Sequence, residues 1–429
     1  MIAFLTFFLG IVTGPHQVEL SAGPGVVRIE LYVDGNKARD LVSPWTTTLD
    51  LGNEIAPQEL VAVAYDRDGK RMGEARQWIN RATSEAEAGF ALERDGAGRV
   101  VAARLVWHCP SAPTPTSVVV ALDGQTIEAK DSGRIPIPSR FSGSSHVLTA
   151  DLTFAGGITA TAVTGFGGTR LDDTGRQLTA VPVRLAAGSP LPKNEQMAGW
   201  FESGGKPLDV VAVEEGPPEV VFVLAGRVRK EFERLVSEDN WPWPWKRPQP
   251  IGLSKESRFR FMLTTPHVAD GSRVVTFAFP VSEECTAETG RFLRLARDTF
   301  LDDLPTSPRI ADAVATSALT ATRRERRRAV VLLLAADAAE AGHLDAARVS
   351  RYLERLRVPL YVWRVSPAMP PAAPDWPGVV DASTVEKLGQ AFQALRDDLD
   401  SQRIVWVEGR FVPSAVAVTA KAAGALVAR

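Results

Sequence analysis

The feature that most constrains the fold of this chain is a strand-and-turn pattern that occurs twice. The segment RIELYVDGN, from Arg28 to Asn36, alternates apolar and polar residues and runs into an Asp-Gly pair, and SVVVALDGQ, from Ser117 to Gln125, has the same arrangement. Alternation with period two is typical of a half-buried β-strand, and Asp-Gly tolerates the positive φ of a hairpin turn. The pattern therefore predicts two successive β-units.

The spacing from each turn to the following strand supports this alignment. Asp34 lies 26 residues before Leu60, which opens the next apolar strand, and Asp123 lies 25 residues before Leu148. Turn residues fix the register of a hairpin more firmly than composition does. Short strands with turns at near-regular intervals are typical of β-sandwiches. We therefore predict one sandwich over residues 17–82 and a second over residues 88–177.

The rest of the chain, residues 178–429, has a different pattern. Continuous apolar runs alternate with segments of helical periodicity, which indicates a parallel sheet with crossover helices. Strands are expected to begin at Glu219, Arg258, Ala329 and Val358, and helices are expected over residues 288–301, 308–321, 344–357 and 384–400. The segment RIVWVEG, from Arg403, is expected to close this sheet. The predicted fold class is multidomain, with all-β sandwiches followed by a doubly wound α/β domain.

Charge and length limit the classes of partner. Lys and Arg number 49 against 51 Asp and Glu, so no overall positive field exists to attract phosphates, and we expect no nucleic-acid partner. The run RRERRR, residues 323–328, is interpreted as cations that complement the dipole at a helix C-terminus; a nucleic-acid patch is the alternative. Beyond the first residues, no apolar run reaches the ~18 residues that suggest a transmembrane span.

An apolar run from Ile2 to Val12 has the length of the hydrophobic region of an export signal. We therefore predict a signal peptide over residues 1–16 and a secreted or periplasmic protein. No Lys or Arg precedes the run and no Ala-x-Ala site follows it, so a buried first strand and a misplaced start codon are the alternatives. Cys109 and Cys285 are the two cysteines, which excludes a disulfide framework.

Three short segments of the first unit carry a family resemblance. They are the strand and turn Val27–Gly35, the pair Pro44-Trp45, and the strand and turn Val61–Gly69. In this order they resemble the corresponding segments of bacterial immunoglobulin-like domains. The resemblance implies a small antiparallel sandwich that spaces or presents other domains, rather than a catalytic module.

A second resemblance rests on four segments of the α/β half. Val220–Leu224 matches a first strand, Arg327–Leu334 a central strand, Val358–Trp363 a later buried strand, and Ile310–Val314 the start of a helix. The ordered set resembles the von Willebrand factor type A domain, especially a divergent branch in secreted bacterial proteins. This resemblance implies an open sheet whose ligand site lies at the carboxyl ends of its strands.

The resemblance also identifies the positions of a metal site. Type A domains bind Mg²⁺ through Asp-x-Ser-x-Ser after the first strand, a Thr and a further Asp. Here Ala225, Arg227 and Arg229 stand at the first three positions, with Thr306 and Asp337 at the other two. A methyl group and two guanidinium groups cannot coordinate a cation, and positive charges repel it. The site is degenerate, and we predict no metal and no cofactor.

Arg227 and Arg229 are the first candidates for an interaction site. Ligands of open α/β sheets bind where strands end, and guanidinium groups there would pair with an acidic partner. The alternative is that both arginines are solvated or pair internally with Glu231 or Glu233.

The second candidate site is an aromatic segment, Trp241-Pro-Trp-Pro-Trp245, with a third indole at Trp243. Alternating proline enforces an extended backbone, and three indoles would form a stacking surface for a sugar or a proline-rich peptide. The alternative is that the indoles fold onto the α/β domain as an apolar cap, because soluble proteins avoid large exposed apolar patches.

These observations together favour a non-enzymatic interaction or adhesion protein of the cell envelope or exterior. It is expected to bind an unknown protein or a cell-envelope polymer without a metal. No nucleophile elbow or phosphate-binding loop occurs and the five histidines lack metal-ligand spacing, so we expect no enzyme activity. A hydrolase site assembled from distant residues and a purely structural envelope spacer are the rival hypotheses.

Overall fold

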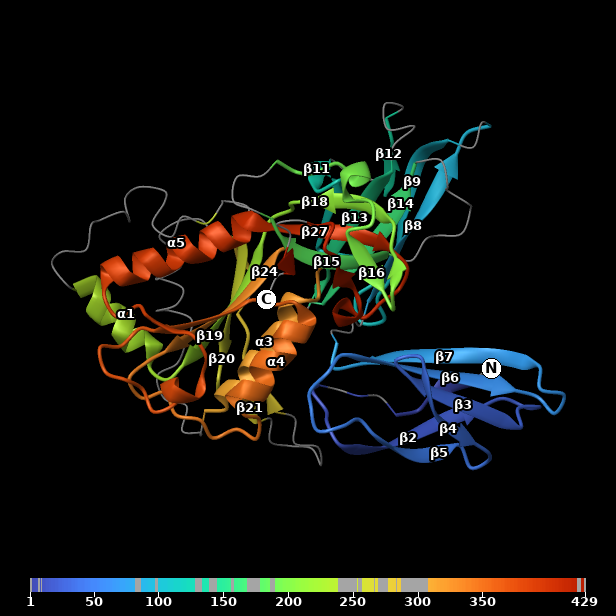
Figure 1. Ribbon diagram of the computed structural model, residues 1–429, viewed down its shortest axis with the longest axis horizontal. Helices are drawn as coiled ribbons and strands as arrows, with labels where there is room; N and C mark the ends of the chain where they lie inside the picture. The colour runs from blue at the N-terminus through green and yellow to red at the C-terminus, as the bar shows by residue number, and fades with distance from the viewer. Residues whose placement is uncertain are drawn as a thin grey trace.

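A computed structural model of the chain shows four modules, which are two β-sandwiches, a third β-unit and an α/β domain (Figure 1). The structure describes residues 2–427 with the exception of residues 7, 9, 82–85, 97–98, 128–132, 139–144, 156–157, 168–177, 186–189, 238–252, 254–256, 266, 269–276, 283, 287–307 and 423–425. The multidomain fold class predicted from the sequence is confirmed, with antiparallel sheets first and a parallel sheet after them.

The first sandwich packs a three-stranded sheet against a four-stranded one. The first sheet has the order β1-β2-β5 and the second the order β4-β3-β6-β7. The strands are β1 (Ile2–Phe4), β2 (Pro15–Ala22), β3 (Arg28–Val33), β4 (Asn36–Leu41), β5 (Thr46–Asp50), β6 (Gln58–Tyr65) and β7 (Arg71–Ile79). Their inward-facing residues, among them Val18, Ile29, Leu31 and Leu60, form one buried core.

The N-terminal apolar run forms part of this sandwich. Strand β1 pairs antiparallel with β2, and Ile2 and Phe4 are buried in the core. Further along the run, the amide of Val12 donates to Oδ1 of Asn80, and Nδ2 of Asn80 donates to the carbonyl of Val12, both at 2.8 Å. The buried first strand, one of the alternatives for this segment, is therefore what the structure contains, and the sandwich includes residues from before position 17.

The second sandwich repeats the strand order of the first. Its sheets have the orders β12-β9-β8 and β11-β10-β13-β14. The strands are β8 (Glu87–Arg94), β9 (Val100–His108), β10 (Ser117–Leu122), β11 (Gln125–Ile127), β12 (Arg134–Pro136), β13 (His146–Thr153) and β14 (Thr159–Phe166). Each of these strands has a counterpart in the first sandwich, seven positions earlier in chain order.

The two Asp-Gly turns are equivalent in detail. Asp34 and Asp123 both have positive φ, 49° and 51°, and each is followed by a glycine of positive φ. Oδ1 of Asp34 accepts the amide of Glu59 at 2.8 Å, and Oδ1 of Asp123 accepts the amide of Val147 at 2.9 Å. The next residues, Leu60 and Leu148, pair with the residue that precedes each turn. The alignment by turn spacing thus identified the same strand pair in both units.

A third β-unit is formed by two separated parts of the chain. One sheet has the order β18-β27-β15-β29 and the other the order β17-β16-β28. The strands are β15 (Leu178–Arg184), β16 (Phe201–Ser203), β17 (Lys206–Pro207), β18 (Val210–Glu214), β27 (Gln402–Glu408), β28 (Ala417–Val418) and β29 (Leu426–Val427), with 3-10 helices η3 (Asn194–Met197) and η6 (Pro413–Ala415). The α/β domain is therefore inserted between β18 and β27.

The position of β27 corrects one prediction. The segment from Arg403 was expected to close the parallel sheet, but it pairs antiparallel with β15 and β18 in the third unit. Its two faces contribute to two cores, with Val405 and Val407 on one side and Ile404 and Trp406 on the other. A strand buried on both faces has the same continuous apolar sequence in either kind of sheet, so periodicity does not distinguish them.

The α/β domain has a doubly wound sheet of order β23-β20-β19-β24-β25-β26. All pairs are parallel except β20 with β23 at one edge. The strands are β19 (Glu219–Ala225), β20 (Arg258–Leu263), β23 (Cys285–Thr286), β24 (Arg328–Leu334), β25 (Leu360–Arg364) and β26 (Val379–Asp381), and β21 (His267–Val268) forms a separate pair with β22 (Phe277–Ala278). The winding direction reverses between β19 and β24, which is the switch point where such sheets bind ligands.

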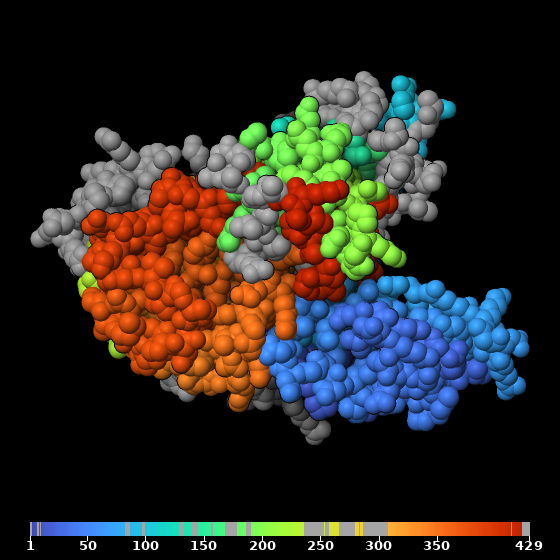
Figure 2. Space-filling model, in the orientation of Figure 1, coloured from blue at the N-terminus to red at the C-terminus, as the bar shows by residue number. Residues whose placement is uncertain are grey.

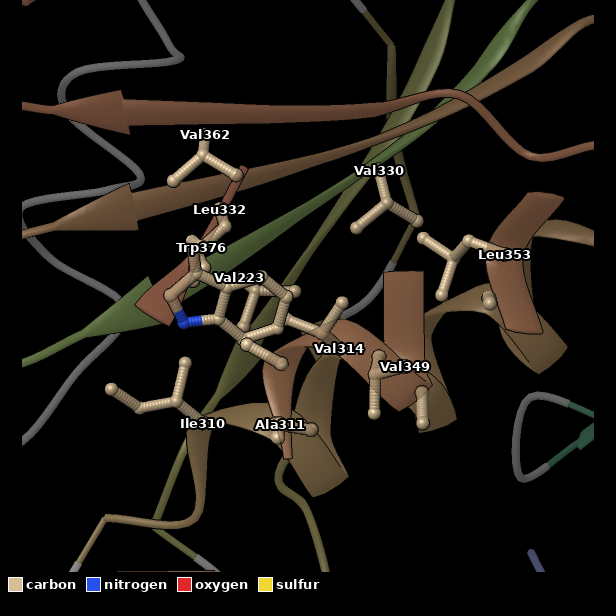
Figure 3. Close-up of a cluster of buried hydrophobic side chains, with 14 of the residues drawn as sticks. Val223, Ile310, Ala311, Val314, Val330, Leu332, Val349, Leu353, Val362 and Trp376 are labelled. Atoms are coloured by element: carbon tan, nitrogen blue, oxygen red, sulfur yellow. The ribbon is translucent and has the colours of Figure 1, made fainter. Parts of the chain in front are cut away.

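Helices cover both faces of this sheet (Figure 1). One face packs on α3 (Ile310–Ala321) and α4 (Ala346–Leu356), and the other on α1 (Val228–Ser237) and α5 (Val385–Ser401), while η5 (Ala373–Asp375) lies in a connection. Figure 3 shows the first of these cores, where Val314 and Val349 of the helices face Val330 and Leu332 of the sheet. The helices expected near 308–321, 344–357 and 384–400 are confirmed; the one expected over 288–301 lies outside the described residues.

The first sandwich is docked against α4. The hydroxyl of Tyr352 donates to the carbonyl of Asn80 at 2.9 Å, and Nη1 of Arg355 donates to the carbonyl of Ile55 at 2.7 Å. Ile55 itself is fully buried in the core of the α/β domain. In the space-filling view the blue surface of the sandwich lies directly against the orange surface of the α/β domain (Figure 2). The modules therefore share core packing, which is a firmer connection than a flexible linker.

Candidate functional site

The switch point of the sheet contains an ion pair where the type A resemblance places a metal. Strand β19 ends at the fully buried Ala225, and β24 ends just before Asp337. Oδ1 of Asp337 accepts the amide of Arg227 at 2.9 Å, and Oδ2 accepts Nε of Arg227 at 2.7 Å. The carboxylate thus meets a guanidinium and a backbone N–H in a charge-assisted pair. The positive charge beside the carboxylate of Asp337 therefore comes from the chain itself, from Arg227.

Gly226 makes this close approach possible. Its φ is +76°, and a Cβ at this position would lie 2.5 Å from Oδ1 of Asp337 and 3.0 Å from the amide of Ala338. Any side chain would therefore displace the carboxylate, in addition to the strain of a left-handed conformation. Glycine after the first strand is required by the ion pair itself.

The charge state of Asp337 follows from the pair. Partial burial would raise the pKa of its carboxyl, but the hydrogen bonds from the amide and guanidinium of Arg227 outweigh burial and hold the pKa below its usual value. Asp337 is therefore an anion at neutral pH and is already neutralised internally. The side chains remain accessible, with 57% of Arg227 and 38% of Asp337 exposed, so the pair is available to a partner at the surface.

Residues next to the ion pair form hydrogen bonds that fix the ends of strands and helices. Oγ1 of Thr264, after β20, donates to the carbonyl of Leu224 at 3.2 Å. Oε2 of Glu340 accepts the amide of Ala311 at 2.7 Å and thereby caps the N-terminus of α3. Thr306, the remaining position of the expected metal site, lies outside the described residues. The carboxylate of Glu340 is committed to backbone amides rather than to an open site.

Further along the same edge, the ends of β25 and β26 carry a second charge cluster. Nη2 of Arg364 lies 2.9 Å from Oδ2 of Asp381, and Nζ of Lys387 lies 2.6 Å from the same oxygen. The hydrogen bond from Lys387 is the main reason why the pKa of Asp381 is well below its ordinary value. Sequence analysis did not single out these residues, because single charges after apolar strands are common.

The second arginine of the candidate interaction site, Arg229, lies on α1. Its Nε is 3.0 Å from Oε1 of Glu233, one helical turn later, and both side chains are partly exposed. This is the internal pairing that was the alternative for Arg229, whereas Arg227 pairs with Asp337. Trp241, Trp243 and Trp245 lie outside the described residues, so the aromatic segment stays a prediction.

Among the described residues, the charges at the strand-end face are paired with one another. Within the described ranges, no three His, Cys, Asp or Glu side chains gather in a way that would hold a metal ion. No helix in the described part of the chain is long and apolar enough to cross a membrane. Cys109 and Cys285 form no disulfide. What this face can do chemically is exchange ion pairs and hydrogen bonds with an acidic or polar surface.

The opposite edge of the sheet contains the arginine run 323–328, which follows the C-terminus of α3 as expected. The run was expected to complement the dipole at a helix C-terminus, and its burial was not expected: Arg324 and Arg328 are 2% and 1% exposed. Arg326 forms an ion pair with Asp151 of the second sandwich. Nη2 of Arg327 donates at 2.6 Å to the carbonyl of Gly216, next to the third unit. These arginines join three modules, which their local sequence does not indicate.

A buried ion network surrounds Arg324. Its guanidinium pairs with Glu284, which also pairs with Arg258 and, at 3.1 Å, with Arg260. Burial alone would raise the pKa of Glu284, but the charges of Arg324 and Arg258 lower it to about 2. Burial is also the main reason why the pKa of Glu219 is raised. These two perturbed carboxylates therefore lie at the amino-terminal edge of the α/β sheet.

Comparisons with known proteins find distant likenesses to solved structures. No protein-family model and no curated protein matches it. The fibronectin(III)-like modules of CbhA from Clostridium thermocellum match at 18% identity over 18% of this chain and 93% of theirs, with a TM-score of 0.17. The central fibronectin-III array of RIM-binding protein matches at 12% identity over 47% of this chain and 81% of its own, with a TM-score of 0.21.

A bacterial ice-binding adhesin of 1.5 MDa is also similar, at 10% identity over 46% of this chain and 75% of its own, with a TM-score of 0.15. Likenesses this low carry no argument about activity or partners. The immunoglobulin-like character of the N-terminal half rests instead on the two sheets of each sandwich and on their repeated strand order.

Proposed function

We propose that the protein is a non-enzymatic interaction or adhesion protein that binds a protein or a cell-envelope polymer at the carboxyl edge of its α/β sheet, without a metal. The observation that carries the proposal is the pair between Arg227 and Asp337 at the switch point. A guanidinium there repels divalent cations and at the same time presents hydrogen-bond donors to a carboxylate-rich partner.

The finer assignment, a degenerate type A-like domain, belongs to the same proposal. It is supported by the doubly wound strand order, by a parallel strand β19 that ends at Ala225, and by Asp337 beside the end of β24. In this assignment the internal guanidinium of Arg227 replaces the ion. The docked sandwiches then act as rigid supports that present the strand-end face, which is consistent with a secreted or periplasmic location.

The first experiment tests the loss of the metal site. We expect calorimetric titration of Mg²⁺ and Mn²⁺ into the full chain to show no micromolar binding, because the described carboxylate at this position, Asp337, is already paired with Arg227. The matched variant Arg227→Ser removes the internal cation and leaves Asp337 with its backbone hydrogen bond alone. Micromolar binding to the unchanged chain that is lost in Asp337→Asn would contradict the proposal.

The second experiment tests the strand-end face. The full chain is immobilised and exposed to solubilised cell envelope, and the retained component is then titrated against variants. Charge reversal of Arg227 and Arg229 to Glu is expected to weaken binding at least about tenfold, as loss of a desolvated charge pair does. Charge reversal of the exposed Arg39 and Arg67 of the first sandwich gives the same net charge and serves as the control. Equal affinities for both double variants would remove the face from the interface.

A hydrolase remains the rival from a different class, and its test is direct. Catalysis by general acid and base needs two titratable groups within reach of one reacting atom. At the strand-end face Asp337, Asp381 and Glu340 are each bound to cations or to backbone amides. We therefore expect no turnover of ester, peptide or glycoside reporter substrates. Turnover that is abolished by Asp337→Asn would favour the rival.

A further inference from the structure

The strand-end face of the α/β sheet contains a short apolar loop between its two groups of charged residues. This loop, residues 366–372, follows β25 and therefore leaves the sheet at the same edge as Arg227. Pro367, Ala368 and Met369 are consecutive and exposed, and Met369 is 65% exposed. An exposed run of three apolar residues is disfavoured in a soluble chain unless it contacts a partner.

The first half of the apolar loop is held from below by Arg364. Nη1 of Arg364 donates to the carbonyl of Ser366 at 2.5 Å and to the carbonyl of Pro367 at 2.7 Å. Oγ of Ser366 accepts the amide of Ala368 at 3.1 Å, and Ser366 is 2% exposed. The loop therefore turns these two carbonyls toward the protein, while its apolar side chains face solvent.

The second half of the apolar loop is fixed to the switch point. The amide of Ala372 donates at 3.0 Å to the carbonyl of Ala338, the residue after Asp337. A few residues later Trp376 is buried, and Figure 3 shows its indole among the side chains of the first core of the α/β domain. Prolines at positions 367, 370 and 371 restrict the backbone further. A loop that is ordered before a partner binds loses little entropy on association.

Charged side chains border the apolar loop on both sides. The pair of Arg227 and Asp337 lies next to the hydrogen bond that fixes its second half. On the other side Arg364 and Lys387 share the carboxylate of Asp381, at 2.9 and 2.6 Å. The side chains of Arg227 and Lys387 are 57% and 48% exposed. Three cations meet two carboxylates in these groups, so the border of the loop suits carboxylates of a partner.

The chemistry of the loop favours a protein over a polysaccharide. A polysaccharide presents hydroxyl groups, which need hydrogen-bond partners when they leave water. The side chains of Pro367, Ala368 and Met369 contain no donor, and a thioether is only a weak acceptor. Methionine is instead enriched at protein interfaces, and its flexible side chain fits pockets of varied shape. An apolar pocket of a folded protein is therefore the better complement.

A membrane surface is a poorer complement than a protein. Surfaces that bind anionic lipid have clusters of Lys and Arg together with several large apolar side chains. The apolar loop exposes one large side chain, that of Met369, and the carboxylates of Asp337 and Asp381 lie beside it. These carboxylates would face anionic headgroups.

We propose that the apolar loop is the anchor through which the strand-end face binds a protein. An apolar pocket of that protein takes the side chain of Met369, and carboxylates around the pocket meet Arg227 and Lys387. An apolar anchor within a charged border is the usual arrangement of a protein interface. This inference rests on the proposed function, because it takes the strand-end face as the binding surface, and it narrows the partner to a protein.

Position-specific crosslinking tests the class of partner. The photoreactive residue p-benzoylphenylalanine is placed at position 369 of the full chain or, as a control, at position 72, where Met72 is 44% exposed on the first sandwich. Both proteins are irradiated with solubilised cell envelope. We expect adducts from position 369 that proteinase K degrades and periodate leaves intact. Adducts with a periodate-sensitive polymer or with lipid, or equal labelling from both positions, overturn the proposal.

Affinities of the crosslinked protein, once purified, test the anchor itself. We expect Met369→Ser to raise the Kd at least about tenfold, because the buried apolar surface of one methionine is lost. Met72→Ser, the matched change at an exposed position, is expected to leave the Kd unchanged. Both side chains are exposed, so both variants fold. An equal Kd for Met369→Ser and the wild type overturns the anchor.

The two proposals fail in different ways. Weaker binding after charge reversal of Arg227 and Arg229, without any effect of Met369→Ser, overturns this inference and leaves the proposed function standing. A loss of binding in Met369→Ser without any effect of charge reversal supports the anchor and contradicts the role given to the Arg227 pair. Envelope from which the full chain retains no component overturns both.

Discussion

Glu214→Gln is the substitution whose effect can be worked out most fully from the structure. Glutamine keeps the shape and the hydrogen-bonding capacity of a protonated glutamate but cannot ionise. In the folded chain burial raises the pKa of the Glu214 carboxyl to about 7, compared with 4.5 for an unperturbed glutamate. The folded state therefore holds a proton at pH values where the unfolded chain has already released it.

The difference between the two pKa values sets the magnitude. About 2.5 pKa units correspond to about 3 kcal/mol, at 1.36 kcal/mol for each unit. The contribution of Glu214 to the free energy of unfolding is highest below pH 4.5, falls as the pH rises from 4.5 to about 7, and is constant above that. At pH 8 the wild-type chain is thus destabilised by about 3 kcal/mol relative to pH 4 through this one group. The glutamine variant cannot ionise, so its stability relative to the wild type increases as the pH rises.

Hydrogen exchange measured by mass spectrometry on peptides from β18 and β27 is the suitable assay, because a chain with four modules does not unfold in one step. The exchange of both proteins is compared at pH 5 and pH 8 after correction for the intrinsic rates. The protection of these strands should become lower in the wild type than in Glu214→Gln as the pH rises. Equal pH dependence in the two proteins would show that Glu214 ionises normally, and it would refute the description of this carboxyl as desolvated.

Three further predictions concern stability. Asp151→Ala leaves the guanidinium of Arg326 buried without its carboxylate. We expect the local free energy of opening, measured by hydrogen exchange on peptides from β13 and β24, to fall by about 3–5 kcal/mol and to be partly restored by Arg326→Met in the same chain; a fall below about 1 kcal/mol would mean that the pair is solvated. The pKa of Glu284 is lowered to about 2, so its contribution to the free energy of unfolding is present above pH 4.5 and is lost as the pH falls toward 2. Glu284→Gln should therefore be less stable than the wild type at pH 7 and equally stable near pH 2. A stability difference that does not change with pH would contradict the ion network. Gly226→Ala is expected to lower stability by about 1–3 kcal/mol, because residue 226 has a positive φ and a Cβ there would clash with Asp337. The control Gly389→Ala, on the exposed face of α5, should be neutral or stabilising.

The sequence predicted those features whose cause is local. The Asp-Gly turns at Asp34 and Asp123 have the positive φ that their composition favours, and their spacing identified the strand that pairs with each. Helix α5 begins after Thr384, whose hydroxyl accepts the amide of Lys387, and α4 begins after Asp345, which caps the helix in the same way. Capping residues and turn glycines act within a few positions of themselves, so one sequence is enough to recognise them.

The features that were not predicted depend on contacts between distant segments. The run of arginines after α3 has the sequence of cations at a helix C-terminus, and the carboxylates of Asp151 and Glu284, from other parts of the chain, make burial of Arg326 and Arg324 favourable. Partners of this kind have no signature in a local pattern.

The insertion of the α/β domain between β18 and β27 explains why the two edges of its sheet differ. Glu214 at the end of β18 is only a few residues from Glu219 at the start of β19, so the amino-terminal edge has to be fixed to the third unit. The buried pairs of Arg324 and Arg326 serve this purpose, together with the hydrogen bonds that Arg327 donates to Gly216. No covalent connection to another module leaves from the opposite edge at Ala225, where Arg227 and Asp337 remain accessible. The edge that is not needed for holding modules together is therefore the one where charged side chains stay exposed, as the proposed binding role requires.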